Sequence, residues 1–167
     1  MPGSNPGSTL PLRRFHDLAE LKSAVGQTLG VSDWITVTQE RIDRFAEATD
    51  DFQWIHVDRE RAAKSPFGTT IAHGYLTLSL IPAMVYQIFT VDGVGARLNY
   101  GSNRIRFTEP VPCNSRLRTH LKLLSAEGLP RGGLRANFEA TVEREGSKKP
   151  PCIAEIITVM LPPEAAA

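Results

Sequence analysis

Asp51 and His56 are the side chains whose types and spacing best suit joint chemistry. The acid precedes the histidine by five positions, within the run FAEATDDFQWIHVD. Downstream, in GTTIAHGYLTLSLIP, His73 and Gly74 open a long apolar segment. A carboxylate and an imidazole can together activate water, and the backbone N–H of a glycine at a helix N-terminus can polarise a carbonyl group. The pattern predicts a catalytic site, provided that the fold brings these parts together.

The first predicted element that positions the acid and the histidine is a helix over about 39–49. Thr38 suits its N-cap, and its core-facing residues recur at helical spacing: Ile42, Phe45 and Ala46. The segment after Asp50 is then expected to be a loop, with Asp51 and His56 just past the helix end. Before this helix we expect a strand around Trp34–Val37, preceded by a short helix over about 15–25.

A second predicted helix, over about 73–88, begins at the His73-Gly74 pair. It is apolar on nearly every side, which predicts a helix buried in the core. Pro82 lies inside it, removes one backbone hydrogen bond and is expected to bend it. The segment is too short and too interrupted by polar residues to span a membrane.

The remaining chain alternates between apolar and polar residues, which is typical of half-buried strands. In three such segments the residues expected to face the core are Leu117, Thr119, Leu121 and Leu123; Leu134, Ala136, Phe138, Ala140 and Val142; and Ile153, Ile157, Val159 and Leu161. Short turns between long strands predict an antiparallel meander, one face of which needs an apolar partner. The buried helix is the candidate partner, so the expected fold class is α+β.

Composition bounds the remaining possibilities. The chain has 167 residues, enough for one well-buried core, and we expect one domain. Its net charge of +1 shows no excess of basic residues of the kind that binds nucleic acid, so no nucleic-acid partner is expected. No signal peptide or membrane span is expected either, so a cytoplasmic protein is predicted. Cys113 and Cys152 lack metal-ligand spacing and are expected to be free thiols. Residues 1–10 are rich in Pro, Gly and Ser, which predicts a disordered tail.

Four stretches together resemble a known family. They are FAEATDDFQWIHVD from Phe45, IAHG from Ile71, LNYG from Leu98 and RIRFTEPV from Arg104. This combination resembles the MaoC-like (R)-specific enoyl-CoA hydratases of the hot-dog superfamily, in particular the NodN-like branch. The resemblance implies a curved antiparallel sheet wrapped around a long central helix, with a single such domain over residues 11–162, a short tail over 163–167 and, usually, a dimer.

The resemblance also implies roles for individual residues. Asp51 and His56 match the D-x4-H motif that holds the reacting water, and Gly74 matches the glycine whose N–H binds the thioester carbonyl oxygen. Many relatives carry Asn-Pro within the motif, where this chain has Gln53-Trp54, so Gln53 is the expected substitute for the orienting asparagine. The implied activity is hydration of trans-2-enoyl thioesters, or the reverse dehydration of (3R)-hydroxyacyl thioesters, carried by coenzyme A or acyl carrier protein.

Several alternatives remain open from the sequence. Asp50 competes with Asp51, although its spacing to His56 does not fit the motif. A metal site on Asp51, His56 and His73 is possible by residue type, but no ligand repeat supports it, so no metal or other cofactor is expected. The ring of His73 is instead expected to hydrogen-bond loop backbone beside the helix start. A hot-dog thioesterase and a non-catalytic acyl-thioester binding subunit are the rival functions.

Overall fold

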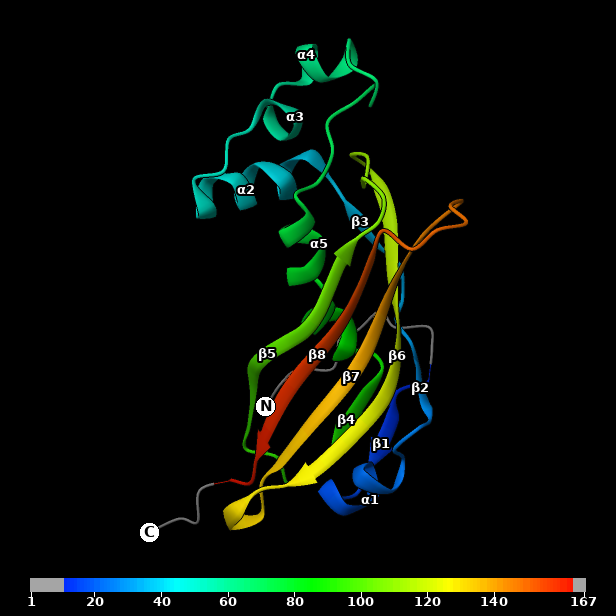
Figure 1. Ribbon diagram of the computed structural model, residues 1–167, viewed down its shortest axis with the longest axis vertical. Helices are drawn as coiled ribbons and strands as arrows, with labels where there is room; N and C mark the ends of the chain where they lie inside the picture. Colours follow the sequence, from blue (N-terminus) through cyan, green and yellow to red (C-terminus); the bar gives the residue numbers. More distant parts are fainter. Residues whose placement is uncertain (1–10, 164–167) are drawn as a thin grey trace.

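The computed structural model describes residues 11–163, and its centre is an antiparallel sheet of long strands (Figure 1). The strand order is β2-β6-β7-β8-β5, and β3 pairs with β6 as well. The bounds are β2 Thr28–Val31, β3 Ile35–Val37, β5 Ala96–Phe107, β6 Ser115–Gly128, β7 Leu134–Arg144 and β8 Cys152–Leu161, with a 3-10 turn at Pro130–Gly132. The predicted tail over 1–10 lies outside the described residues, as do residues 164–167 of the predicted tail over 163–167. Strands β6, β7 and β8 form the predicted meander.

Alternation in the sequence identified the buried face of β6 and β7 correctly. Every apolar residue expected to face the core on these two strands is buried, from Leu117 to Leu123 and from Leu134 to Val142. In β8, however, Cys152, Ala154 and Met160 face the core, whereas Ile153 and Leu161 are exposed. Both faces of this strand carry apolar residues, so its sequence did not reveal which face is buried.

The predicted central helix is present but divided. Helix α5 spans Gly74–Ser79 and helix α6 spans Ile81–Val85, and they lie against one face of the sheet (Figure 1). The break falls at Leu80 rather than at Pro82. Proline has no N–H to donate to the carbonyl of residue i−4 and its ring crowds that carbonyl, so the disruption occurs in the turn that precedes Pro82.

The expectation that this helix is buried on every side is wrong. Tyr75 and Tyr86 are 67% and 54% exposed, and Ser79 and Ala83 are exposed between them. These four residues follow one another at helical spacing, so one side of the α5–α6 segment is uncovered in the single chain. The opposite side, with Leu76, Leu80, Ile81 and Met84, enters the core.

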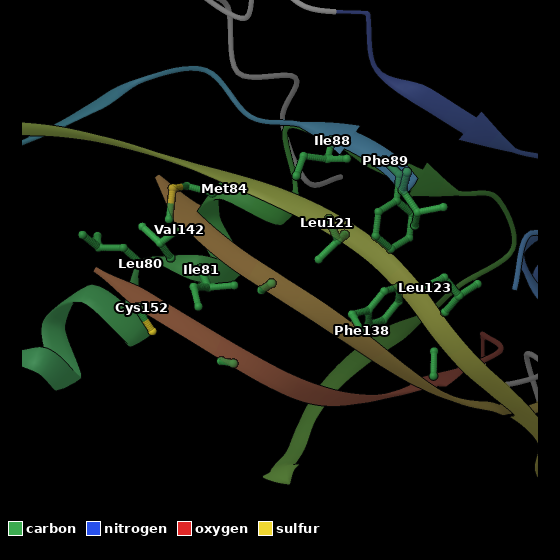
Figure 2. Close-up of a cluster of buried hydrophobic side chains, with 14 of the residues drawn as sticks. Leu80, Ile81, Met84, Ile88, Phe89, Leu121, Leu123, Phe138, Val142 and Cys152 are labelled. Atoms are coloured by element: carbon green, nitrogen blue, oxygen red, sulfur yellow. The ribbon is translucent and has the colours of Figure 1, made fainter. Parts of the chain in front are cut away.

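Figure 2 shows how this core closes over the sheet. Ile81 and Met84 are fully buried, as are Leu121 and Leu123 of β6. Phe138 of β7 packs against Phe89, with ring centroids 5.6 Å apart. Burial of side chains of this size contributes roughly 1.5–3 kcal/mol each, which fixes the helix against the sheet.

The N-terminal part differs from expectation. Helix α1 covers only Leu18–Ser23, where Asp17 caps it by accepting a 2.7 Å hydrogen bond from the Glu20 N–H. Phe15 belongs instead to strand β1, Arg13–Phe15, which pairs in parallel with β4, Phe89–Val91. A three-residue strand that pairs with a segment more than 70 residues away leaves no periodic signal in the sequence.

Helix α2, Gln39–Thr49, forms as predicted, with the Thr38 hydroxyl capping its first turn by accepting a hydrogen bond from the Arg41 N–H at 3.3 Å. The following segment is not the expected plain loop. It contains the short helices α3, Trp54–Val57, and α4, Arg59–Ala63. Within the described residues, no helix is both long and apolar enough to cross a membrane.

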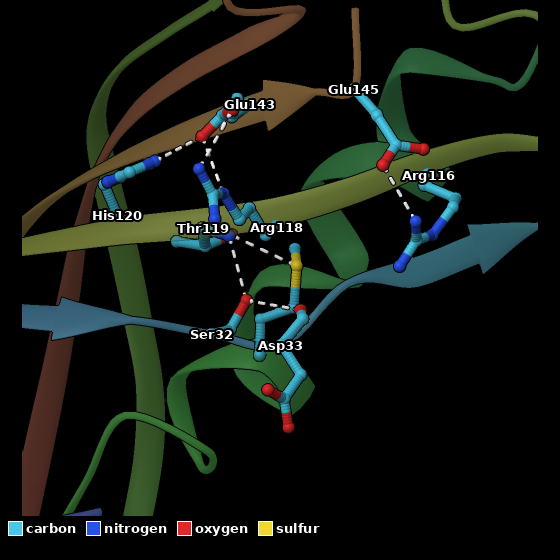
Figure 3. A network of polar contacts seen from close by, with 9 residues as sticks. Ser32, Asp33, Arg116, Arg118, Thr119, His120, Glu143 and Glu145 are labelled. Atoms are coloured by element: carbon cyan, nitrogen blue, oxygen red, sulfur yellow. Dashed lines mark hydrogen bonds and ion pairs between the residues drawn. The ribbon is translucent and has the colours of Figure 1, made fainter. Parts of the chain in front are cut away.

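The outer face of the sheet carries polar networks (Figure 3). Glu143 accepts two hydrogen bonds from the Arg118 guanidinium and contacts His120 Nε2 at 2.6 Å, and these contacts hold the pKa of Glu143 below its usual value. Beneath them, the buried Ser32 hydroxyl accepts a hydrogen bond from the Thr119 N–H. These contacts join β6 to β7 and to the segment between β2 and β3.

Candidate active site

His56 lies in the short helix α3 and is 6% exposed. Its Nδ1 is 2.6 Å from the carbonyl oxygen of Ile71. A carbonyl oxygen only accepts hydrogen bonds, so Nδ1 must carry the hydrogen and the neutral ring keeps its lone pair on Nε2. The fold therefore fixes the tautomer that can accept a proton or a hydrogen bond through Nε2.

Burial lowers the pKa of His56 below the ordinary histidine value of 6.5. The hydrogen bond to Ile71 and the charge of Asp51 act in the opposite direction, while the neighbouring His73 adds to the lowering. Because the pKa lies below 6.5, the neutral ring predominates at pH 7 and its Nε2 lone pair is available.

Asp51 stands at the exposed end of this group. Helix α2 ends at Asp50, whose backbone adopts a left-handed conformation with φ of 57°, and the chain then turns toward α3. Asp51 offers a carboxylate oxygen that lies within 4.8 Å of one nitrogen of His56 and one of His73. The two members of the D-x4-H pair are thus close in space as well as in sequence.

His73 is almost fully buried, at 3% exposure, and its ring stacks on that of His56 with centroids 3.7 Å apart and planes 28° apart. Its Nε2 lies 3.0 Å from the backbone carbonyl oxygen of Asp51. The prediction that this ring hydrogen-bonds loop backbone near the start of the helix is confirmed.

Gln39, the first residue of α2, supports the site although the sequence did not indicate such a role. Its amide nitrogen donates to the backbone carbonyl of His56 at 2.8 Å and to Asp43 at 2.7 Å, and its amide oxygen accepts from the Thr70 hydroxyl. These contacts tie α3 to α2. No sequence signal separates this glutamine from an ordinary exposed helix residue, because its partners come from different parts of the chain.

Gly74 and His56 line one cleft of about 350 Å³. Gly74 is the first residue of α5, so its N–H has no carbonyl partner within that helix. The cleft walls are largely apolar and include Ile55, Ile71, Ala72, Phe107, Pro110, Val111 and Pro151, with Thr77, Thr108 and Glu109 as polar members. A carbonyl group placed between Gly74 and His56 would meet a hydrogen-bond donor on one side and a lone pair on the other.

Phe107 is a cleft residue that the sequence analysis missed. Its ring packs so closely over Gly74 that a Cβ added there would stand 2.7 Å from Phe107 Cδ2. In the sequence it appeared only as part of the RIRFTEPV stretch, and it lies 43% exposed at the end of β5. Glycine at position 74 is therefore required by this close approach as well as by any role of its N–H.

The comparisons with known proteins agree with this architecture. A family model described as "MaoC like domain" matches residues 20–134. The chain belongs to the MaoC-like family. It is 52% identical over 146 residues to 3-hydroxyacyl-thioester dehydratase Z of Mycobacterium tuberculosis, covering 87% of this chain and 97% of that protein. Nodulation protein N of Rhizobium leguminosarum bv. viciae is 46% identical over 145 residues, with 86% and 90% covered.

Solved structures support the same assignment. The R-hydratase PhaJ1 from Pseudomonas aeruginosa, in its unliganded form, superposes with a TM-score of 0.64 at 28% identity, covering 84% of this chain and 83% of that one. The MaoC-like chain therefore has the predicted hot-dog fold. The expected single long helix is replaced by two short helices, α5 and α6, which are separated at Leu80.

Gln53 is the site residue that the structure connects least to this MaoC-like cleft. It is exposed at the N-cap of α3, and its side chain makes no capping hydrogen bond among the described residues. The cleft lining begins two residues later, at Ile55. An orienting role for Gln53 stays a prediction that rests on the resemblance alone.

The ring geometry also bears on a metal at this MaoC-like site. Asp51, His56 and His73 offer ligand atoms within 4.8 Å of one another. Imidazole nitrogens bind a metal in the plane of their ring, but the two rings are stacked 3.7 Å apart and tilted by only 28°. The planes of the two rings, being nearly parallel, intersect only well beyond the ring edges. A single metal ion therefore cannot lie in both ring planes at bonding distance unless one ring moves.

Proposed function

We propose that this protein is an (R)-specific enoyl-thioester hydratase, which in the reverse direction dehydrates (3R)-hydroxyacyl thioesters. The observation that carries the proposal is the fixed His56 tautomer, which leaves the Nε2 lone pair without a hydrogen-bond partner among the described residues. His56 lines the same cleft as Gly74, and one of its ring nitrogens lies within 4.8 Å of an Asp51 carboxylate oxygen. The names of the dehydratase from Mycobacterium tuberculosis and of the R-hydratase from Pseudomonas aeruginosa support the same chemistry.

The reaction divides into two proton transfers and one carbon–oxygen bond. Asp51 and His56 hold a water molecule against C3 of the trans-2-enoyl thioester. The water oxygen bonds to C3 while one of its protons passes to this pair, and the pair delivers a proton to C2 on the same face. Negative charge that develops on the thioester oxygen meets the Gly74 N–H, a contact of a kind worth ~3 kcal/mol in other enzymes.

The substrate is proposed to be an acyl thioester of coenzyme A or of acyl carrier protein. Apolar cleft walls suit the acyl chain and the thioester group, while Thr77 and the Gly74 N–H supply polar contacts. Gln53 is proposed to orient the acid, following its place in the motif. A cytoplasmic location is part of the same proposal.

The proposal is tested by incubating the purified protein with trans-2-enoyl-CoA substrates of increasing chain length. We expect loss of the enoyl absorbance and formation of the (3R)-hydroxyacyl product, identified by chiral analysis. Release of free coenzyme A without hydration would instead indicate a thioesterase. Tight binding of enoyl-CoA without any turnover would indicate a non-catalytic binding subunit.

Chelation is expected to leave the hydration rate unchanged, because the stacked imidazoles disfavour a shared ion. The rate is measured before and after dialysis against EDTA, with a fixed concentration of enoyl-CoA. If activity is lost and one added metal ion restores it, the hypothesis that Asp51 and His56 activate water without a metal ion is wrong.

We also propose that the protein is a homodimer formed through β5 and the exposed side of α5 and α6. Among the described strands β5 pairs only with β8, which leaves its other edge open over 12 residues. Tyr75 and Tyr86 are exposed on the neighbouring helices. A long open strand edge beside exposed aromatic residues favours association. Antiparallel pairing of the β5 strands of two chains would satisfy the backbone hydrogen-bonding groups of both edges symmetrically.

Light scattering after size exclusion is expected to give twice the mass of one chain. Ala83→Arg places a charge on the exposed side of α6 and should shift the protein toward monomers. Val25→Arg is the matched control, since Val25 is 43% exposed but follows the C-cap of α1, and this variant should remain dimeric. A monomeric wild-type protein, or an unchanged Ala83→Arg variant, would count against this interface.

A further inference from the structure

His73 occupies the centre of the site although it does not line the cleft. One side of its ring stacks on His56 at 3.7 Å, and Phe45 of α2 packs against it with centroids 5.0 Å apart. The residue precedes Gly74 directly as the N-cap of α5. A single buried ring thus contacts α2, α3 and the start of α5.

The same ring holds the backbone of the acid. Its Nε2 is 3.0 Å from the Asp51 carbonyl oxygen, which only accepts hydrogen bonds, so Nε2 carries the hydrogen and donates. The remaining nitrogen, Nδ1, is buried and has no hydrogen-bond partner among the described residues. The donated hydrogen bond is therefore the polar contact that fixes this ring.

Asp51 needs such a restraint because its own side chain has little to hold it. It is exposed, and the hydrogen bond that its carboxylate accepts within the described chain comes from the Gln53 N–H at a long 3.4 Å. The preceding residue, Asp50, is in a left-handed conformation that ends α2. The direction of the Asp51 carboxylate thus depends on where its backbone is held.

We propose that His73 is a positioning residue that fixes Asp51 relative to His56 by donating a hydrogen bond to the Asp51 carbonyl while stacking on the His56 ring. The inference rests on the proposed hydratase function. His73 transfers no proton in the reaction. Its contribution is preorganisation: a displacement of about 1 Å in a reacting group can cost roughly 100-fold in rate.

Two substitutions separate the contacts of His73. His73→Phe keeps a flat ring against His56 but removes the donor, and kcat is expected to fall roughly 10- to 100-fold with KM nearly unchanged. His73→Gln loses the ring but carries an amide N–H at about the reach of Nε2, so it should recover most of the lost rate. Melting temperatures of both variants establish that they are folded.

The deciding experiment repeats His73→Phe in an Asp51→Asn background. If His73 acts through the Asp51 carboxylate, the substitution should cost less than about 2-fold there, because the group it positions is already disabled. If His73→Phe does not fold, the same cycle is run with His73→Asn, whose shorter amide cannot reach the Asp51 carbonyl.

An equal loss in both backgrounds would show that His73 only supports the fold and would overturn the inference, while the proposed function would stand. A His73→Phe enzyme with wild-type kcat would overturn it as well. A wild-type protein that hydrates no enoyl thioester would overturn the proposed function and the inference together.

Discussion

Asp51→Asn and His56→Ala are each expected to lower the hydration rate by ~10²-fold or more while the protein stays folded. In the proposed reaction the two groups share one task, which is to hold and activate the water molecule. The carboxylate and the neutral His56 ring lie within 4.8 Å of each other, and His56 Nε2 is the lone pair that the Ile71 contact leaves free. Removing either group leaves the water without its full set of acceptors.

The buried position of His56 calls for a second variant. His56→Ala removes the donor to the Ile71 carbonyl as well as the Nε2 lone pair, and an unsatisfied buried carbonyl costs roughly 1–3 kcal/mol of stability. His56→Asn places an amide N–H near the position of Nδ1 and can keep that hydrogen bond. A His56→Asn enzyme that is stable but inactive would assign the loss to Nε2.

Asp50→Asn is the matched control for Asp51→Asn. Asp50 has φ of 57°, a left-handed conformation that asparagine adopts readily, so its replacement should alter neither stability nor rate appreciably. Rates are measured per folded molecule with one enoyl-CoA substrate. Near-normal turnover by Asp51→Asn would mean that the base lies elsewhere.

Gly74→Val is the second substitution from which a large effect is expected, roughly 10²-fold on turnover. Any Cβ at this position would stand 2.7 Å from Phe107 Cδ2, so valine must push the ring aside or move the start of α5. Either movement displaces the Gly74 N–H or fills the space that the thioester carbonyl needs. Phe107 is 43% exposed and can move outward, so the melting temperature should fall less than the rate.

The control must be a glycine where a side chain is harmless. Gly128 ends β6 and a Cβ there would meet nothing within 4 Å, so Gly128→Val should preserve both rate and melting temperature. A valine at Ala83 in the adjoining helix α6 would not serve as a control for crowding, because Ala83 is exposed and lies on the proposed dimer surface. If Gly74→Val melts far earlier yet keeps its rate per folded molecule, the oxyanion role is wrong and Gly74 is structural.

A double variant distinguishes crowding from loss of the donor. Phe107→Ala removes the atoms that a Cβ at position 74 would meet. If the double variant Gly74→Val/Phe107→Ala recovers the rate of Phe107→Ala alone, the loss came from crowding by the ring. If it remains slow, the valine itself blocks or displaces the N–H.

The sequence predicted the features that depend on local rules. Thr38 caps α2 by accepting a hydrogen bond from an N–H in the first turn of the same helix. Apolar and polar residues alternate from Leu134 to Val142 because one face of β7 is buried along this stretch. The D-x4-H spacing predicted that Asp51 and His56 lie together, and the structure places them within 4.8 Å; their catalytic roles stay a proposal that the resemblance to the MaoC-like family suggests. Each of these signals lies within a few residues of the chain.

The sequence was misleading where both sides of an element are apolar. In β8, Ile153 and Leu161 are as apolar as Ala154 and Met160, so hydrophobicity did not reveal which set is buried. Ala83 was likewise expected to be buried with its apolar helix, yet Ala83 and the neighbouring Tyr75 are exposed in the single chain. Only the position of the sheet, on one side of the helices, decides which apolar face it covers.

Tertiary structure alone decided how the site is assembled. His73 stacks on His56 and reaches the backbone of Asp51, 22 residues away, and Gln39 holds the carbonyl of His56, 17 residues away. Phe107 meets Gly74 from the end of β5. Residue type and spacing determine which groups can act, but these contacts join segments that only folding brings together. The tautomer of His56 and the restraint on Asp51 are therefore properties of the fold.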